Sequence, residues 1–213
     1  MKTPVQKPGM DYLVLVNRQN PLPGSWTETL EMVSMTNTAG DLFEVEKETA
    51  AAYEHLKADL ERNDGIYIEL DSALRSVEAQ QEILDQFIAE YGAEKAAKTA
   101  ALPGHSEHHT GLALDLCFRV REEDGRFTDV CSNEDMLKEA YRGIWSTIHG
   151  KLAGYGFILR YPEGSEPITG FDYEPWHIRY LNSPEIAGEI MSRPGLTLEE
   201  YLEGRSGTAG PRP

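Results

Sequence analysis

The chain of 213 residues is long enough to bury one substantial hydrophobic core, and nothing in its composition requires a second domain. Its 36 acidic residues exceed its 20 basic residues, which gives a formal net charge of −16. Because this charge would repel a nucleic-acid backbone or an anionic membrane surface, we expect a small soluble substrate and no nucleic-acid partner.

The N-terminal segment contains no apolar run of the length that a leader or a membrane anchor needs. Its one apolar run covers only positions 12–16, and no apolar run in the chain approaches membrane-spanning length. We therefore expect no membrane insertion and a cytoplasmic location. A chain from which a leader had been removed would show the same sequence and would be extracytoplasmic.

Residues 45–62, VEKETAAAYEHLKADLER, are rich in Ala, Glu, Lys and Leu with apolar residues near helical spacing, and predict a helix. Asn63-Asp64-Gly65 then supplies a stop signal.

Residues 65–76, GIYIELDSALRS, are rich in β-branched and aromatic residues and predict a strand that ends near Arg75.

A second helix follows this strand directly. Ser76 is a residue type that often caps the start of a helix, and the helical pattern of VEAQQEILDQFIAEY ends before Gly92. The corner between strand and helix therefore presents Arg75, Ser76 and Gln80.

The rest of the chain mixes short strands and helices. Alternation predicts a strand over residues 111–120, and the following elements are a turn at 124–125, helical spacing over 134–153, strands at 157–161 and near 177–181, and helix starts at 183–184 and 197–200. Because no regular βαβ order appears, we expect an α+β fold with a small, mainly antiparallel sheet and flanking helices. We assign residues 1–203 to one domain and expect the Gly- and Pro-rich residues 204–213 to form a disordered tail.

Asp115 is the residue in the alternating strand that needs a partner. Strand alternation places Leu112, Leu114 and Leu116 on one face, which we expect to be core, and Asp115 on the other beside small side chains. A carboxylate buried on a sheet without a partner costs several kcal/mol, because burial of even an uncharged polar group costs on the order of 2–7 kcal/mol. The strand alone leaves two partners equally open, an Arg or Lys in an ion pair and a metal ion.

Histidines near Asp115 favour the metal. His105, His108 and His109 precede the strand, and Glu174 stands three residues before His177 in YEPWHIRY. Imidazole and carboxylate are ordinary zinc ligands, and a carboxylate next to a ligand His can serve as the base of a metallohydrolase. Pro175 argues against a helix here, so we expect a bend or bulge between Glu174 and His177.

Two motifs in this order resemble those of a known family. SEHHTGLALD matches S-x-H-x-x-G-x-A-x-D and EPWHIRY matches E-x-W-H-x-R-Y, the signatures of the VanY-like D-alanyl-D-alanine carboxypeptidases of peptidase family M15. LVNRQNPLP, LRSVEAQ and YGFILRYPEGSEPITGFDYEPWHIRY extend the resemblance over most of the chain, with Leu74 in place of the family's Tyr. The chain is most similar to the cytoplasmic dipeptidase and carboxypeptidase branch associated with vancomycin resistance.

The resemblance implies an active site with one zinc ion. His108, Asp115 and His177 would be its ligands, Glu174 the catalytic base, and Arg75 the cation that stabilises the oxyanion. Ser106, Ser76 and Gln80 would contact the substrate, a D-Ala-D-Ala terminus on the free dipeptide or on a peptidoglycan precursor. Alternatives are an L,D-carboxypeptidase or endolysin-type peptidase of the same fold, and a catalytically inactive zinc-binding recognition module.

The remaining His and Cys residues have structural interpretations. We expect His105 to be a loop residue and His109 a surface or pocket-rim residue, because neighbouring side chains in an extended backbone diverge. Cys117 lies two residues beyond Asp115, too far along the strand to ligate the same ion. Two cysteines do not make a disulfide framework, and we expect Cys117 and Cys131 to be reduced. The sequence does not indicate an oligomeric state.

Overall fold

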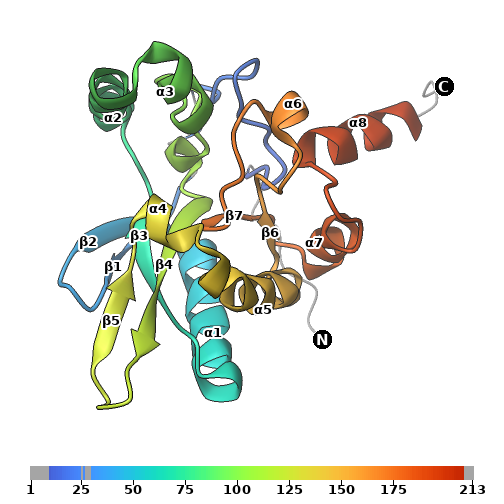
Figure 1. Cartoon of the computed structure of the whole chain (residues 1–213). Helices are drawn as coiled ribbons and strands as arrows, with labels where there is room; N and C mark the ends of the chain where they lie inside the picture. The colour runs from blue at the N-terminus through green and yellow to red at the C-terminus, as the bar shows by residue number, and fades with distance from the viewer. Residues whose placement is uncertain (1–9, 25, 27–29, 209–213) are drawn as a thin grey trace.

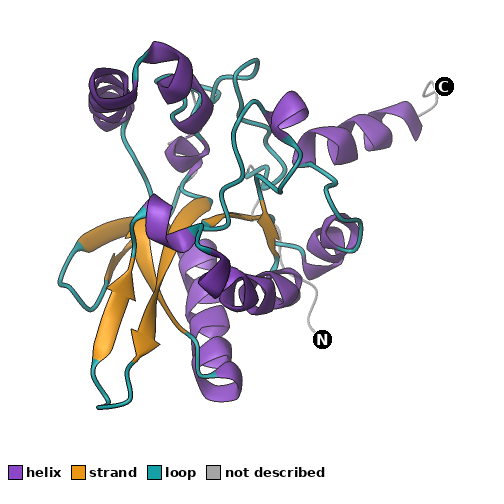
Figure 2. Ribbon diagram, viewed as in Figure 1, coloured by secondary structure: helices purple, strands orange, loops and turns teal. Residues whose placement is uncertain are grey.

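The computed structural model describes residues 10–24, 26 and 30–208, without the side chains of 206–208, and has the predicted α+β architecture (Figures 1 and 2). Its main sheet has the order β3-β4-β7-β6, with β5 also paired to β4, and every pairing is antiparallel. The strands are β3 (Tyr67–Ser72), β4 (Ala113–Arg121), β5 (Phe127–Val130), β6 (Phe157–Leu159) and β7 (His177–Tyr180). A separate hairpin pairs β1 (Met32–Thr36) with β2 (Leu42–Glu46).

The helices form two groups around the sheet (Figure 1). The longer helices are α1 (Lys47–Asp64), α2 (Val77–Tyr91), α3 (Ala93–Thr99), α5 (Arg142–Leu152), α7 (Pro184–Met191) and α8 (Leu198–Thr208), and the short ones are η2 (Glu107–Thr110), α4 (Asn133–Met136), η3 (Glu139–Tyr141), η4 (Ala153–Tyr155) and α6 (Glu166–Thr169). Helices α2 and α3 stand apart as a lobe with a small apolar cluster of their own, built on Leu84, Ala96 and Ala100. The chain thus has a main body and an overhanging helical lobe.

β4 is the strand that connects the core to the polar site. Leu112, Leu114 and Leu116 are fully buried, as the alternation predicted. On the other face, Asp115 lies opposite His177 of β7 and, on the other side, opposite Ser72 of β3. The pairing of β4 with both neighbours therefore brings three sequence-distant segments to one point.

The helix and strand bounds follow local signals, with some differences; Val45 and Glu46, predicted as the start of a helix, belong to β2. α1 begins at Lys47, where the Glu46 side chain accepts a hydrogen bond from the Thr49 amide as N-cap. It ends at Asp64, and the following Gly65 has φ +66°, a conformation that favours glycine. The strand predicted over 65–76 ends at Ser72, because the register of β3 shifts between Leu70 and Ser72 in a bulge.

The helix predicted over residues 134–153 is divided. α4 ends at Met136, a 3₁₀ turn occupies Glu139–Tyr141, and α5 covers only Arg142–Leu152. The physical reason lies at Lys138, whose backbone is extended with φ −63° and ψ 141° and so breaks the helical path. The prediction of one continuous helix was wrong here.

The C-terminal region follows its capping signals. Ser183 caps α7 ahead of Pro184. At the start of α8, the Thr197 amide donates to the Glu200 carboxylate and the Glu200 amide donates to the Thr197 hydroxyl, which is a capping box. α8 continues to Thr208, so residues 204–208 of the expected tail are helical, and residues 209–213 lie outside the described residues. Within the described part of the chain, no helix combines the length and apolar character needed to cross a membrane.

Candidate active site

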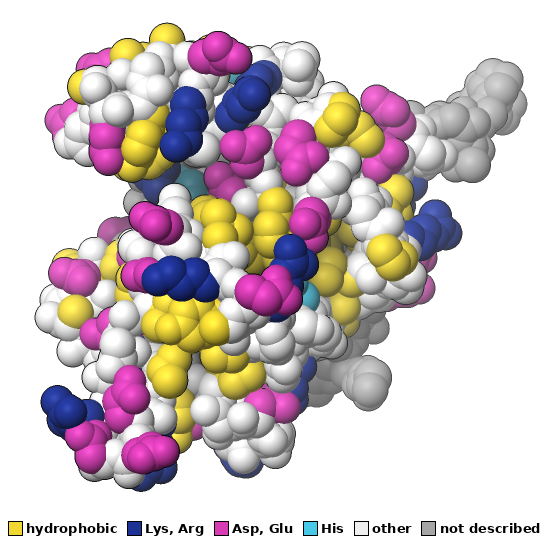
Figure 3. Space-filling view, in the orientation of Figure 1, with side chains coloured by type: hydrophobic (Ala, Val, Ile, Leu, Met, Phe, Trp, Pro, Cys, Tyr) yellow, Lys and Arg dark blue, Asp and Glu magenta, His cyan; other side chains and the backbone are white. Residues whose placement is uncertain are grey.

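A pocket of about 290 Å³ opens where the α2–α3 lobe overhangs the sheet. In the space-filling view the surface is hollowed between this lobe and the main body, and histidine and basic side chains are visible inside (Figure 3). The wall contains Ser106. It also contains the five residues predicted to carry the chemistry, which are Arg75, His108, Asp115, Glu174 and His177. Segments far apart in the sequence thus meet in one cavity.

His108 is oriented by its own turn. The Ser106 hydroxyl accepts the His108 amide at 3.3 Å as N-cap of η2, and the His108 Nδ1 lies 2.7 Å from the Ala73 carbonyl oxygen. A carbonyl can only accept, so Nδ1 carries the ring proton and Nε2 is left as a lone-pair donor. That Nε2 lies 3.0 Å from Asp115 Oδ2.

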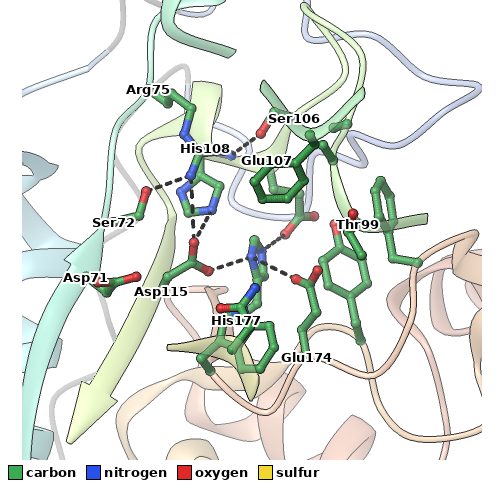
Figure 4. Close-up of a pocket in the computed structure, with 17 residues that line it drawn as sticks. Asp71, Ser72, Arg75, Thr99, Ser106, Glu107, His108, Asp115, Glu174 and His177 are labelled. Carbon is green, nitrogen blue, oxygen red and sulfur yellow. Dashed lines mark hydrogen bonds and ion pairs between the residues drawn. The ribbon is translucent and has the colours of Figure 1, made fainter. Parts of the chain in front are cut away.

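His177 meets the other oxygen of the same carboxylate (Figure 4). Its Nδ1 lies 3.0 Å from Asp115 Oδ1, yet Oδ1 has no well-aligned hydrogen bond among the described residues. Burial by itself would raise the pKa of Asp115, but His108 and His177 hold it well below its usual range, so the carboxylate is ionised.

These three side chains fit a divalent cation. Their donor atoms all lie within 4.8 Å of one another, and one ring nitrogen of each histidine lies 3.0 Å from an oxygen of Asp115. Two imidazoles and one carboxylate with an open side toward a pocket form the donor set typical of catalytic zinc. Arg75 Nη2 lies 3.8 Å from Asp115 Oδ2, so the ion pair considered as the alternative partner is also present.

Glu174 reaches the site from a turn. The His177 amide donates to the Glu174 carbonyl at 3.2 Å, which is the bend predicted around Pro175. The bend brings Glu174 Oε2 to 3.8 Å from His177 Nδ1. Burial raises the pKa of Glu174 to about 8, with Asp115 adding to the rise and His177 and Arg75 opposing it. Such a carboxylate is suited to exchange a proton near neutral pH.

Arg75 is fixed above Asp115 by two hydrogen bonds. Its Nη1 donates to Gln80 Oε1 and its Nη2 to Ser72 Oγ, both at 2.8 Å. Burial lowers the pKa of Arg75, and Asp115 and Glu174 oppose this effect. Its guanidinium therefore stays charged in the pocket wall, where it can bind an anionic group.

The predicted substrate contacts are placed differently from one another. Ser106 lines the pocket and is buried. Ser76 is exposed, and its hydroxyl accepts the Ala79 amide at 3.1 Å as N-cap of α2. Gln80 is buried outside the pocket wall and holds Arg75, as well as donating to the Ala101 carbonyl at 2.8 Å. The structure therefore brings Ser106, but neither Ser76 nor Gln80, to the cavity.

His109 departs from its prediction as a surface or rim residue. It is only 4% exposed, accepts the Gly104 amide at Nε2 and lies with Nδ1 2.7 Å from the Arg75 carbonyl oxygen. His105 is a loop residue, as expected, with Nδ1 2.8 Å from the Asn17 carbonyl oxygen. His109 is buried because it connects the loop before η2 to the corner that carries Arg75.

Cys117 belongs to a different group of side chains from the candidate active-site residues. Both cysteines are free, and the sulfur atoms lie with the Asp71 carboxylate in a second cluster of donor atoms. Burial raises the pKa of the Cys117 thiol, and Cys131 adds to this. Cys117 is therefore no ligand of the site at Asp115.

Several wall residues were not singled out from the sequence, among them Tyr161, Asp71 and Thr99. Tyr161 packs its ring 4.8 Å from the His177 ring, and Asp71 and Thr99 line the same cavity. Asp71 occupies the β3 bulge, which alternation cannot reveal, and Thr99 ends a helix with no chemical motif. For Tyr161 a signal existed, because it lies in the FILRY segment of the C-terminal resemblance.

Comparison with known proteins places this geometry in a family. The family model "VanY: D-alanyl-D-alanine carboxypeptidase" matches residues 43–183. A D-alanyl-D-alanine carboxypeptidase of Enterococcus faecalis is 35% identical over 199 residues, which cover 89% of this chain and 65% of that protein. The chain thus spans just under two thirds of that relative's length.

Solved structures agree with this result. The vancomycin-resistance D,D-pentapeptidase VanY of a VanB-type cassette, in complex with Zn(II), superposes with a TM-score of 0.69 at 32% identity, covering 91% of this chain and 99% of that one. The LdcB LD-carboxypeptidase superposes with a TM-score of 0.67 at 32% identity, covering 90% and 86%. Because the family model covers most of the chain and includes every residue of the candidate site, this chain belongs to the VanY D-alanyl-D-alanine carboxypeptidase family.

Proposed function

We propose that this protein is a zinc-dependent peptidase that hydrolyses the C-terminal D-alanyl-D-alanine bond of a small peptide and releases D-alanine. The observation that carries the proposal is the convergence of His108, Asp115 and His177 with Glu174 and Arg75 in one pocket. Family membership supports the reaction class, and the zinc complex of the related VanY structure supports the metal. The substrate is the free dipeptide or a peptidoglycan precursor.

His108 Nε2, His177 Nδ1 and the Asp115 carboxylate would hold one zinc ion. The chemistry supplied there by bound zinc is Lewis acidity, which polarises the peptide carbonyl and acidifies water. His108 and His177 contribute neutral nitrogen donors, and the charge of Asp115 offsets part of the charge of the cation. The β4–β7 pairing fixes two of the three ligands relative to each other.

Glu174 is the proposed base. Its carboxylate lies on the pocket side of His177 and would take a proton from the attacking water, then deliver it to the departing amine of D-alanine. The raised pKa of Glu174 favours the second of these transfers, because a carboxyl that holds a proton near neutral pH can serve as an acid. The first transfer, in which Glu174 takes a proton from water, would be favoured by a zinc ion beside Glu174.

Arg75 is the proposed oxyanion partner. Its guanidinium faces the pocket from the side of Asp115 opposite Glu174, and Gln80 and Ser72 hold it in place before substrate arrives (Figure 4). A preorganised cation stabilises the tetrahedral oxyanion more than the neutral carbonyl, which lowers the barrier to attack. Ser106 lies in the same wall and is a proposed substrate contact.

The test is D-alanine release from a panel of substrates with and without a chelator. We expect release from D-Ala-D-Ala or from UDP-muramyl pentapeptide, loss of release with chelator, and recovery with zinc. Release from neither substrate, or release that survives complete removal of metal, would contradict the proposal.

A muramyl tetrapeptide in the same panel tests a second activity. The similarity to the LdcB LD-carboxypeptidase, equal in identity to the similarity to VanY, makes an L,D-carboxypeptidase the candidate to exclude. Preferential release of D-alanine from the tetrapeptide would favour that activity. A non-catalytic recognition module would bind zinc and release nothing, although Glu174, Arg75 and all three ligand residues are present in the pocket wall.

A further inference from the structure

Glu107 is a buried carboxylate that the proposed reaction does not use. It stands between Ser106 and His108 in η2, and its side chain is fully buried. Oε1 accepts hydrogen bonds from Arg160 Nε at 2.8 Å and from Arg179 Nη1 at 2.7 Å. Oε2 has no hydrogen bond among the described residues. One oxygen of this carboxylate is therefore occupied and the other is not.

The free oxygen faces the free nitrogen of a proposed zinc ligand. His177 Nε2 is also buried without a hydrogen bond among the described residues, and it lies 3.6 Å from Glu107 Oε2. The other ring nitrogen, Nδ1, faces Asp115 and Glu174 (Figure 4). A neutral imidazole that donates a lone pair from Nδ1 must carry its proton on Nε2.

We propose that Glu107 is a positioning residue for His177. Its Oε2 accepts the Nε2 proton, which fixes the ring orientation and the tautomer, so that the Nδ1 lone pair points toward Asp115 and the metal. This inference rests on the proposed zinc-peptidase function and adds a residue to it. His108 has the equivalent support from the Ala73 carbonyl, so each proposed histidine ligand has an acceptor behind it.

The surroundings of Glu107 hold it rigidly. Arg160 donates to both oxygens of Glu199, at 2.8 Å and 2.7 Å, and Arg179 donates to the carbonyl oxygens of Tyr12 and Val14 at 3.1 Å and 2.9 Å. Arg160 and Arg179 are completely buried. The network connects α8 and the N-terminal segment to the back of the His177 ring, so Glu107 has little freedom to move away.

An amide cannot replace this carboxylate. If the oxygen of a glutamine faced the two arginines, its amino group would point at the His177 Nε2 proton. If the amide were flipped, its amino group would point at the arginine donors. Glu107→Gln therefore keeps the shape of the side chain and places donor against donor in either orientation, which makes it the informative substitution.

The matched control is Glu199→Gln. It makes the same Glu-to-Gln change in the same buried network, at the other carboxylate that accepts hydrogen bonds from Arg160, and it leaves the Glu107–His177 pair in place. Both variants would be compared with wild type for zinc affinity by competition with a chromophoric chelator, and for metal-free stability by urea unfolding. We expect Glu107→Gln to weaken zinc affinity by about 10- to 100-fold. Glu199→Gln should keep wild-type affinity even where its stability falls.

A purely structural role would give a different result, namely loss of zinc affinity in both variants in proportion to their loss of stability. Unchanged affinity in Glu107→Gln would also overturn the inference. If Glu107→Gln does not fold, nitrogen-15 NMR of the zinc-loaded wild type decides, because it reports which His177 nitrogen carries the proton. A proton on Nε2 supports the inference and a proton on Nδ1 overturns it. Failure of wild type to bind zinc would instead refute the proposed function.

Discussion

At the scale of single residues, Asp115 organises the site because both of its oxygens face histidine nitrogens. His108 Nε2 lies 3.0 Å from Oδ2, and His177 Nδ1 lies 3.0 Å from Oδ1. The same carboxylate raises the pKa of Glu174, so the proposed ligand set and the proposed base are electrostatically coupled.

Replacing Glu174 with glutamine tests the base directly. The amide keeps the size of the side chain but accepts no proton, so we expect turnover to fall by about 10²- to 10⁴-fold. Zinc content, measured by mass spectrometry, should stay at the wild-type level, because Glu174 is not among the donor atoms grouped around Asp115.

Glu163→Gln is the control for this substitution. Its side chain is 63% exposed and lies 3.4 Å from Arg142, outside the pocket wall. We expect wild-type D-alanine release from it. Near wild-type release from Glu174→Gln would show that another group takes the proton.

At the scale of elements, the corner between β3 and α2 connects local stability to the site. A bulge ends β3 at Ser72, the chain turns, and Ser76 caps α2 while Arg75 points back into the pocket. The resemblance implied a substrate contact for Ser76, whereas its hydrogen bond gives it a capping role. The two roles predict different measurements.

Ser76→Ala separates them. Loss of the cap should reduce the free energy of unfolding by about 1 kcal/mol. KM for the best substrate of the panel should stay unchanged, because Ser76 is exposed and outside the cavity. Ser76→Asn, which restores a capping side chain, should recover the stability. A raised KM in both variants, with stability retained in Ser76→Asn, would establish a substrate contact.

At the scale of the whole molecule, buried ion pairs connect the ends of the chain to the site. Glu107, Arg160, Arg179 and Glu199 come from four different segments, and Glu107 lines the pocket. Removing one member of such a network leaves an uncompensated buried charge, at a cost of about 3–5 kcal/mol. The network therefore makes the site depend on correct packing of α8 and of the N-terminal segment.

This network predicts a pH dependence of stability. Burial by itself would raise the pKa of Glu107, but Arg160 and Arg179 hold it well below its usual range. Because the pKa is depressed in the folded state, the stabilisation is fully present above the unfolded value of about 4.3 and is lost as the pH falls below it.

Metal-free Glu107→Gln should therefore be less stable than wild type near neutral pH, with a gap in unfolding free energy that narrows as the pH falls from about 5 to about 3.5. Urea unfolding across this range measures the gap. Glu163→Gln, changed at an exposed position, should follow the wild-type curve. A gap that does not change with pH would show that ionisation of Glu107 contributes nothing to stability.

Local signals predicted much of the fold and the centre of the site. Alternation identified the buried face of β4 and singled out Asp115, capping residues located the starts of α2, α7 and α8, and the two spaced motifs indicated His108, Glu174 and His177. These features depend on neighbours within a few residues, so the sequence displays them. The division of the helix predicted over 134–153 depends on the extended backbone at Lys138, which no strong local signal announced.

The sequence by itself determined the antiparallel α+β class, the family to which the chain belongs and the residues proposed to carry the chemistry. Only the tertiary structure decided that Ser76 caps a helix, that His109 is buried and that Glu107 lies behind His177. The physical reason is distance along the chain. One oxygen of the buried Glu107 carboxylate accepts hydrogen bonds from partners 53 and 72 residues away, and such pairings exist only once the strands and helices have packed.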